Sequence, residues 1–319
     1  MIRKNPAGRT CRILSSVLNW QREKRKNIHL ELMFVYNSKN IEDAYGTEPE
    51  LLVYAGVPAE MFLANHYPDK DLAQIHAAMD NIRRINPPKI VLISTIAVYD
   101  DPIGVNEDAY IDIDKLSTYG KNRRLLEQYV EENYPEHLIV RLPALFGDGL
   151  KKNFIYDFIH VIPGMLTEKK FEELKNQDAY IDGFYTLQDN GFYKVNSNLS
   201  EECRKSLKQY FKNIGFSALN FTDSRSVYQF YNLAHLWEHI KIAVENHIHI
   251  LNTAVEPIKI ADLYMELTGH EFKNEFADKF YNYDYRTKYA TLYSENGQYI
   301  FRRHVVEEEL KRFIECSKV

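Results

Sequence analysis

The sequence predicts an α/β fold: a doubly wound, mostly parallel sheet with a smaller C-terminal lobe. Apolar segments at 50–57, 89–94 and 137–147 alternate with helical patterns at 70–85 and 117–133. Such alternation is typical of parallel strands joined by right-handed crossovers. The segment 89–94, KIVLIS, is almost wholly apolar, as expected of a strand buried on both faces.

Each predicted element of the first 150 residues follows from its local pattern. Residues 28–37 alternate and are rich in aliphatic and aromatic side chains, which indicates a strand. The helix predicted over 70–85 ends before Pro87 and Pro88. In the helix predicted over 117–133 the residues expected to face inward are Leu125, Leu126, Tyr129 and Val130.

The pattern changes after residue 150. We therefore predict a sheet domain over 1–150 and a substrate lobe over 151–319. Residues 165–220 are polar, rich in Tyr and Asn and weakly periodic. A helix near 233–245, a strand at 247–254 and a helix at 258–269 that ends at Gly269 then follow. This regularity indicates that 225–270 returns to the main domain.

Composition and charge indicate which kinds of partner and location to expect. The 319 residues are 45% hydrophobic and carry a net charge of -5, so we expect neither a nucleic-acid nor a membrane partner. Three widely spaced cysteines predict neither a disulfide framework nor a cysteine metal site. No apolar run reaches the length of a membrane span, and the N-terminus lacks the apolar centre of a signal peptide. We expect a cytoplasmic protein.

The carboxyl ends of the predicted strands are the expected place for function, because ligands bind there in open α/β sheets. They carry Ala55-Gly56, Ser94-Thr95 and Pro143.

A tyrosine and a cation share one face of the helix that begins in STYGKNRRLLE, at Tyr119 and Arg123. A free tyrosine has a pKa of about 10, and a fixed cation nearby lowers it toward the range where proton transfer is useful. Several such pairs arise by chance in a chain with 23 tyrosines, so the pair alone is also consistent with an ordinary amphipathic helix.

The neighbouring motifs strengthen the functional interpretation. KIVLISTIAVYDD, then Glu107, then YGKNRRLLE and LIVRLPALFGDG follow one another in this order. Their order and spacing resemble the extended short-chain dehydrogenase/reductases, the NAD-dependent nucleotide-sugar epimerase/dehydratase family. The matched residues are Thr95, Tyr119, Glu127, Arg141 and Gly147.

The resemblance implies a Rossmann-like domain that binds NAD or NADP and a nucleotide-sugar substrate. It implies that Thr95 orients the substrate oxygen and that Tyr119 acts as general acid/base. Arg123 stands where the family has a lysine, so the resemblance implies that Arg123 biases the tyrosine and contacts the ribose of the cofactor. It also implies a possible homodimer.

Other binding residues are expected by the same resemblance. For the cofactor they are Gly8, Thr10, Ala55, Gly56 and Pro143, although Cys11 and Leu14 occupy positions where the family's phosphate loop has glycines. For the substrate they are Ser94, Asn153 and Arg225, with a solvated loop charge as the alternative for the last two.

The leading hypothesis is thus an NAD(P)-dependent epimerase, dehydratase or reductase acting on a nucleotide-sugar. The Arg123 substitution and the altered glycine loop favour an alternative, a degraded relative that binds a nucleotide or a protein partner without turnover. A remoter alternative is a zinc peptidase, because HLWEH places His235, Glu238 and His239 in the inverted zinc signature. We expect no metal.

Overall fold

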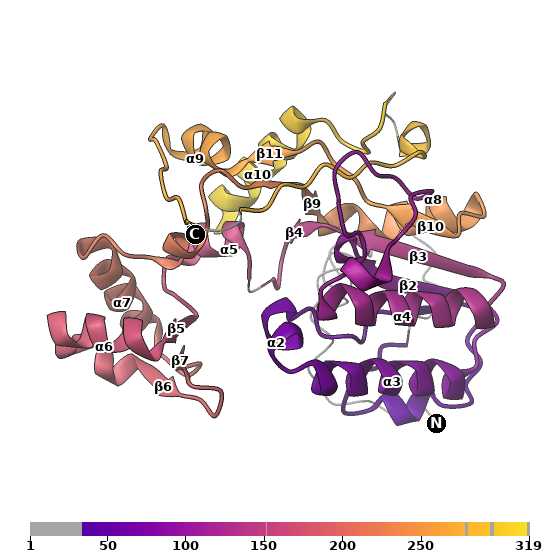
Figure 1. The fold of residues 1–319 in the computed structure, drawn as a ribbon, viewed down its shortest axis with the longest axis horizontal. Helices are drawn as coiled ribbons and strands as arrows, with labels where there is room; N and C mark the ends of the chain where they lie inside the picture. The colour runs from indigo at the N-terminus through magenta and orange to yellow at the C-terminus, as the bar shows by residue number, and fades with distance from the viewer. Residues whose placement is uncertain (1–33, 151, 278–279, 294–296, 318–319) are drawn as a thin grey trace.

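A parallel sheet forms the centre of the molecule (Figure 1). The computed structural model describes residues 34–150, 152–277, 280–293 and 297–317. Its main sheet is 4-stranded with the order β1-β2-β3-β10, and every pairing is parallel. The strands are β1 (Leu52–Tyr54), β2 (Ile90–Thr95), β3 (His137–Leu142) and β10 (Ile250–Asn252). The expected α/β class is confirmed.

Helices cover both faces of this sheet because the strands alternate their apolar side chains between two clusters. Ile90 and Leu92 pack with the helices α3 (Pro68–Ile85) and α4 (Thr118–Asn133). Val91 packs on the opposite side, with the cluster that contains α8 (Leu236–Glu245). In Figure 1, α3 and α4 lie below the sheet and α8 lies above it.

Local signals explain where the two helices below the sheet begin and end. Pro68 occupies the first turn of α3, and Asn86 ends it in the left-handed conformation with φ 59°. Ser117 caps α4 by accepting a hydrogen bond from the Gly120 amide. Both helices match their predicted ranges within two residues.

The structure differs from the sequence prediction in two places, residues 34–37 and Leu125. Within the predicted strand 28–37, residues 28–33 lie outside the described residues, and residues 34–37 are not in a strand. Leu125 is 38% exposed, so its predicted inward orientation is wrong, whereas Leu126 and Val130 are buried. The apolar stripe of α4 is narrower than predicted because Asn122, Arg123 and Glu127 take buried positions on the same helix.

The C-terminal part adds two small pairs of strands and several helices to the upper face. Strand β4 runs parallel to β9, and β8 runs antiparallel to β11. These segments contribute to the same core cluster as α8. No helix among the described residues has the length and apolar character needed to cross a membrane. The elements are α2 (Met61–His66), β4 (Ala144–Phe146), α5 (Phe154–His160), β8 (Val227–Tyr228), β9 (Phe230–Asn232), β11 (Ile258–Lys259), α9 (Ile260–Thr268) and α10 (Arg303–Ser317).

Residues 161–217 form a small sub-domain beside the main body, at the left of Figure 1. Its antiparallel sheet has the order β5-β7-β6, and its apolar side chains form a cluster of their own. The chain enters and leaves at one place, where the Ala218 amide donates to the Val161 carbonyl at 2.7 Å. The elements are β5 (Met165–Thr167), α6 (Glu168–Gln177), β6 (Tyr185–Leu187), β7 (Phe192–Val195) and α7 (Glu201–Asn213).

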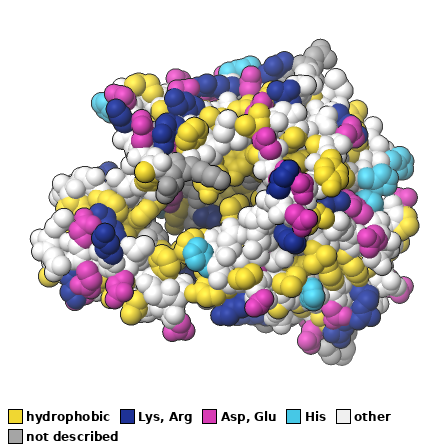
Figure 2. Space-filling view, viewed as in Figure 1, with side chains coloured by type: hydrophobic (Ala, Val, Ile, Leu, Met, Phe, Trp, Pro, Cys, Tyr) yellow, Lys and Arg dark blue, Asp and Glu magenta, His cyan; other side chains and the backbone are white. Residues whose placement is uncertain are grey.

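A hollow separates this sub-domain from the main body, and Figure 2 shows hydrophobic side chains in its depth. The carboxyl end of β3 points toward the sub-domain (Figure 1). An aromatic contact spans the two parts across the hollow. The ring of Phe62 on α2 meets that of Phe192 on β7 edge to face, with centroids 5.3 Å apart.

Candidate active site

Thr95 and Tyr119 come together at the carboxyl edge of the main sheet. Thr95 is the last residue of β2, and its hydroxyl oxygen accepts a hydrogen bond from the Ala97 amide at 3.2 Å. Tyr119 lies in the first turn of α4. The Thr95 side chain acts on the Tyr119 hydroxyl from close range and lowers its pKa.

Gly120 allows this meeting because α4 approaches the turn after β2 very closely. A Cβ at position 120 would lie 2.1 Å from the carbonyl oxygen of Ala97. Any larger residue would push the start of α4 away from that turn, and Tyr119 would move with it. The close contact with Ala97 therefore explains why a glycine follows Tyr119.

The edge that holds the pair is also the accessible part of the sheet. Ile90, Val91 and Leu92 are fully buried, whereas the last three residues of β2 are only partly buried. Gly56 after β1 is exposed, and Pro143 after β3 is partly exposed. Central strands lose burial at one end where a ligand site opens, so this edge is the candidate site.

Arg123 makes its contacts inside the protein. Its Nη1 forms an ion pair with Asp71 of α3, and its Nη2 donates to the Pro58 carbonyl at 2.7 Å. Asn122 also donates to Asp71, at 2.8 Å. Both terminal nitrogens thus have an acceptor inside the protein, which fixes the Arg123 side chain against α3 and the segment before α2.

The acidity of Tyr119 differs from what the Tyr-cation pattern predicts. Burial raises the pKa of Tyr119 above its usual value. The charge of Arg123 and the side chain of Thr95 lower it, as expected, and the charge of Asp71 raises it again. The pKa remains raised because burial outweighs the cation, whose effect Asp71 partly offsets.

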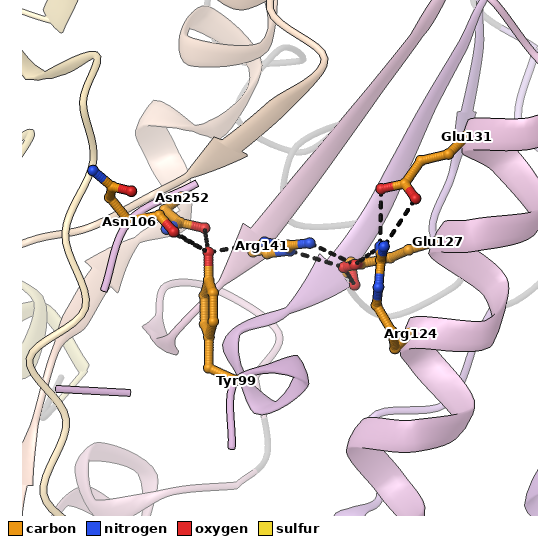
Figure 3. Close-up of polar contacts among 8 residues, drawn as sticks. Tyr99, Asn106, Arg124, Glu127, Glu131, Arg141 and Asn252 are labelled. Atoms are coloured by element: carbon orange, nitrogen blue, oxygen red, sulfur yellow. Dashed lines mark hydrogen bonds and ion pairs between the residues drawn. The ribbon is translucent and has the colours of Figure 1, made fainter. Parts of the chain in front are cut away.

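A buried polar network lies behind the pair (Figure 3). Arg141 of β3 donates to Glu127 of α4 through Nε at 3.1 Å and Nη2 at 2.7 Å. It also donates to the Tyr99 hydroxyl at 2.8 Å. The Ser94 hydroxyl donates to Glu127 at 2.6 Å. The Ser94 hydroxyl proton is therefore part of this network.

Glu107 anchors the loop after β2 to the C-terminal segment. Its carboxylate accepts hydrogen bonds from the amides of Asn252 (2.9 Å) and Lys288 (3.0 Å) and from the Thr287 hydroxyl (2.6 Å). The motif at 107 thus has a structural role in the described residues. Asp71, Asn252 and Thr287 were not predicted, because their partners are distant in sequence and no short motif contains them.

The two remaining substrate candidates are held by neighbouring groups. Asn153 caps α5, with its side chain accepting from the Ile155 amide at 3.0 Å. Arg225 binds Asp223 through two hydrogen bonds and donates to the Phe276 carbonyl at 2.8 Å. Both side chains fix local structure, and neither lies in the cluster formed by Thr95 and Tyr119.

The fit of a nicotinamide dinucleotide can be judged for the described residues. Ala55, Gly56 and Pro143 lie after β1 and β3, on either side of Thr95 at the same edge. Gly8 and Thr10 of the predicted phosphate loop lie outside the described residues. The edge and the Thr95–Tyr119 pair fit the nicotinamide end of the group, and Arg123 beside them is ion-paired with Asp71.

The zinc alternative is not supported. His235 pairs with Glu309 at 2.7 Å, and His239 Nδ1 lies 2.8 Å from the Tyr231 hydroxyl. Glu238 points outward and pairs with Lys241. No group of three or more potential ligands suited to a metal ion occurs in the parts of the chain that the structure describes.

Comparison with known proteins gives structural matches only. No protein-family model matches the sequence, and no curated protein matches it. Solved structures do match. UDP-glucose 4-epimerase from Thermotoga maritima, with UDP-glucose, has a TM-score of 0.58 and 13% identity, covering 95% of this chain and 94% of its own.

Two further structures extend the comparison. RMD from Pseudomonas aeruginosa, complexed with NADPH, has a TM-score of 0.58 and 11% identity and covers 94% of both chains. UDP-N-acetylglucosamine 4-epimerase from Methanobrevibacter ruminantium M1, with UDP-N-acetylmuramic acid, has a TM-score of 0.52 and 12% identity, covering 83% of this chain and 76% of its own. The chain therefore has the Rossmann-like fold of the nucleotide-sugar epimerases and reductases, as the sequence motifs implied.

Proposed function

We propose that the protein is an NAD(P)-dependent oxidoreductase that acts on a nucleotide-linked sugar, with Tyr119 as its proton-transfer group. The observation that carries the proposal is the Thr95–Tyr119 pair, which the close packing at Gly120 holds at the accessible edge of the sheet. The matching structures support the substrate class, because two of them contain UDP-glucose or UDP-N-acetylmuramic acid, and they support the cofactor, because a third contains NADPH.

The chain's own groups have simple roles in this reaction. A bound nicotinamide supplies or accepts the hydride. The Thr95 hydroxyl orients the reacting oxygen of the sugar, and the Tyr119 hydroxyl passes a proton to or from it. Ala55, Gly56 and Pro143 line the side of the edge where the dinucleotide lies. The sub-domain across the hollow supplies the surface that selects the sugar nucleotide.

One observation favours a second function, a binding protein without turnover. Arg123 takes the place of the lysine and is committed to Asp71 and to the Pro58 carbonyl. A site without a ribose-directed cation would retain less affinity for the nicotinamide half of the cofactor. Such a protein would bind the nucleotide part of a sugar nucleotide and leave it unchanged.

Calorimetric titration separates the two functions. We expect NAD(H) or NADP(H) to bind the purified protein more tightly than about 1 mM. The variant Tyr119→Phe should keep this affinity and lose turnover, whereas Tyr110→Phe, a change at a side chain 88% exposed, should leave both unchanged. Absence of binding by all four dinucleotide forms would exclude the oxidoreductase, and binding of UDP alone would support the second function.

A further inference from the structure

We propose that Asp71 is a positioning residue that neutralises Arg123 and thereby keeps Tyr119 protonated, so that the site gives a proton to a carbonyl oxygen. This inference rests on the proposed function and narrows it. Among epimerases, dehydratases and reductases, it selects a reductase, and its substrate class is a nucleotide-linked sugar that carries a ketone or aldehyde.

The ion pair between Asp71 and Arg123 is enclosed by protein. The two side chains are 7% and 6% exposed. Asn122 donates to the same carboxylate oxygen as Arg123 does, so Asp71 is fixed from two positions on α4. Such a pair carries no net charge, and removal of one partner would leave the other charge buried and unbalanced.

The pair also lies directly beside the tyrosine. The Arg123 guanidinium carbon lies 3.9 Å from the centroid of the Tyr119 ring. Three other groups face Tyr119 from the neighbouring elements. They are Thr95 of β2 at the hydroxyl and Asp71 of α3, and Asn65 of α2, which accepts from the Tyr119 amide.

The surroundings of Tyr119 therefore disfavour the phenolate. A nearby cation stabilises a phenolate only to the extent that its charge is not already balanced, and burial favours the neutral phenol. The raised pKa of Tyr119, caused mainly by burial, agrees with this geometry. An epimerase or a dehydratase must first oxidise a sugar hydroxyl, which requires a group that accepts a proton. A neutral phenol is suited to the opposite direction.

The reductive step balances with Tyr119 as the acid. The carbonyl carbon receives a hydride from a reduced nicotinamide dinucleotide, which is thereby oxidised. The C=O double bond becomes a C–O single bond, and its oxygen takes the phenolic proton of Tyr119. A proton from solvent then restores the phenol.

NMR of protein labelled with carbon-13 at tyrosine Cζ tests the protonation state without relying on activity. The Tyr119 resonance is assigned by its loss in Tyr119→Phe. In the wild type we expect it to keep the phenol shift up to at least about pH 10, the titration range of a free tyrosine. In Asp71→Asn the unbalanced Arg123 should lower its titration midpoint by about 1 to 3 pH units.

The matched control is Asp69→Asn, an exposed carboxylate on the same helix, which should leave the Tyr119 titration unchanged. A wild-type midpoint below about pH 9 would overturn the inference, and so would an unchanged midpoint in Asp71→Asn. If Asp71→Asn does not fold, the wild-type titration decides alone. Failure of dinucleotide binding would instead remove the proposed function and leave the titration result in place.

Discussion

Arg141 and Glu127 form a two-bonded ion pair in the interior, with side chains 2% and 0% exposed. Glu127 also accepts from Ser94 and Arg124, so three side chains donate to one carboxylate (Figure 3). The pair joins α4 to β3 and thereby fixes the helix that carries Tyr119 against the sheet.

The first prediction concerns this pair. Glu127→Ala should lower the free energy of unfolding by about 3 to 5 kcal/mol, because it leaves Arg141 buried without its counter-charge. Urea denaturation followed by circular dichroism measures the change. Glu201→Ala removes an exposed ion pair with Lys205 and should change stability by less than about 1 kcal/mol. Equal effects of the two substitutions would contradict the structural role of Glu127.

The second prediction concerns Gly120. Gly120→Ala should destabilise the protein by about 1 to 3 kcal/mol, because the new Cβ would meet the Ala97 carbonyl oxygen at 2.1 Å. Gly164→Ala is the matched control, since a Cβ there has nothing within 4 Å. Thermal unfolding of both variants gives the comparison. A variant Gly120→Ala as stable as the control would show that α4 can retreat from β2 at little cost.

The third prediction is a pH dependence from His239. Burial and the neighbouring His235 lower the pKa of His239 to about 3, while Glu309 acts in the opposite direction. The unfolded chain binds this proton near pH 6.5, so it holds more protons than the folded chain between the two values. The contribution of neutral His239 to the free energy of unfolding is therefore complete above about pH 6.5. It decreases as the pH falls, by about 2 kcal/mol at pH 5.

His239→Asn tests this dependence, because asparagine keeps a polar partner for the Tyr231 hydroxyl and does not titrate. Urea denaturation at pH 7 and pH 5 should show a smaller decrease for this variant than for the wild type. His270→Asn, at an exposed position, should retain the wild-type decrease. If the loss of stability in acid is the same in His239→Asn, other groups cause it.

The fourth prediction concerns the contact across the hollow. Phe62→Ala removes the edge-to-face partner of Phe192, which is worth about 0.5 to 1.5 kcal/mol beyond burial. Global unfolding should change little, because Phe62 is 43% exposed. Amide hydrogen exchange of β7, measured by mass spectrometry, should become faster. Leu187→Ala, at an exposed side chain of β6, is the control, and equal exchange in the two variants would argue against a bridging role.

The sequence predicts the sheet well because its strands are recognisable from short apolar segments. Residues 90–92 and 138–142 are buried in succession, which leaves a clear local signal. Leu125 shows the limit of that reasoning. Helical periodicity places it inward, yet the inward positions of α4 include Arg123 and Glu127, whose burial depends on Asp71 and Arg141 from other segments.

The site could be predicted only in part for the same reason. Thr95 and Tyr119 were found because each lies in a motif tied to a strand end or a helix start. The commitment of Arg123 to Asp71 joins residues 52 positions apart, and no local pattern encodes it. Ser94 was assigned to the substrate because its position at a strand end is visible in sequence, whereas its partner Glu127 is visible only in the fold.

The hydrogen bond between Ala218 and Val161 holds the two ends of the sub-domain together where it joins the main body. Its two ends leave and rejoin the main body side by side, and its buried apolar side chains form a cluster of their own. Insertions, deletions or wholesale exchange of 162–217 would thus leave the strand register of the Rossmann-like sheet untouched. Under the proposed function, the surface that selects the substrate and the group that transfers the proton would lie on separable parts of the chain.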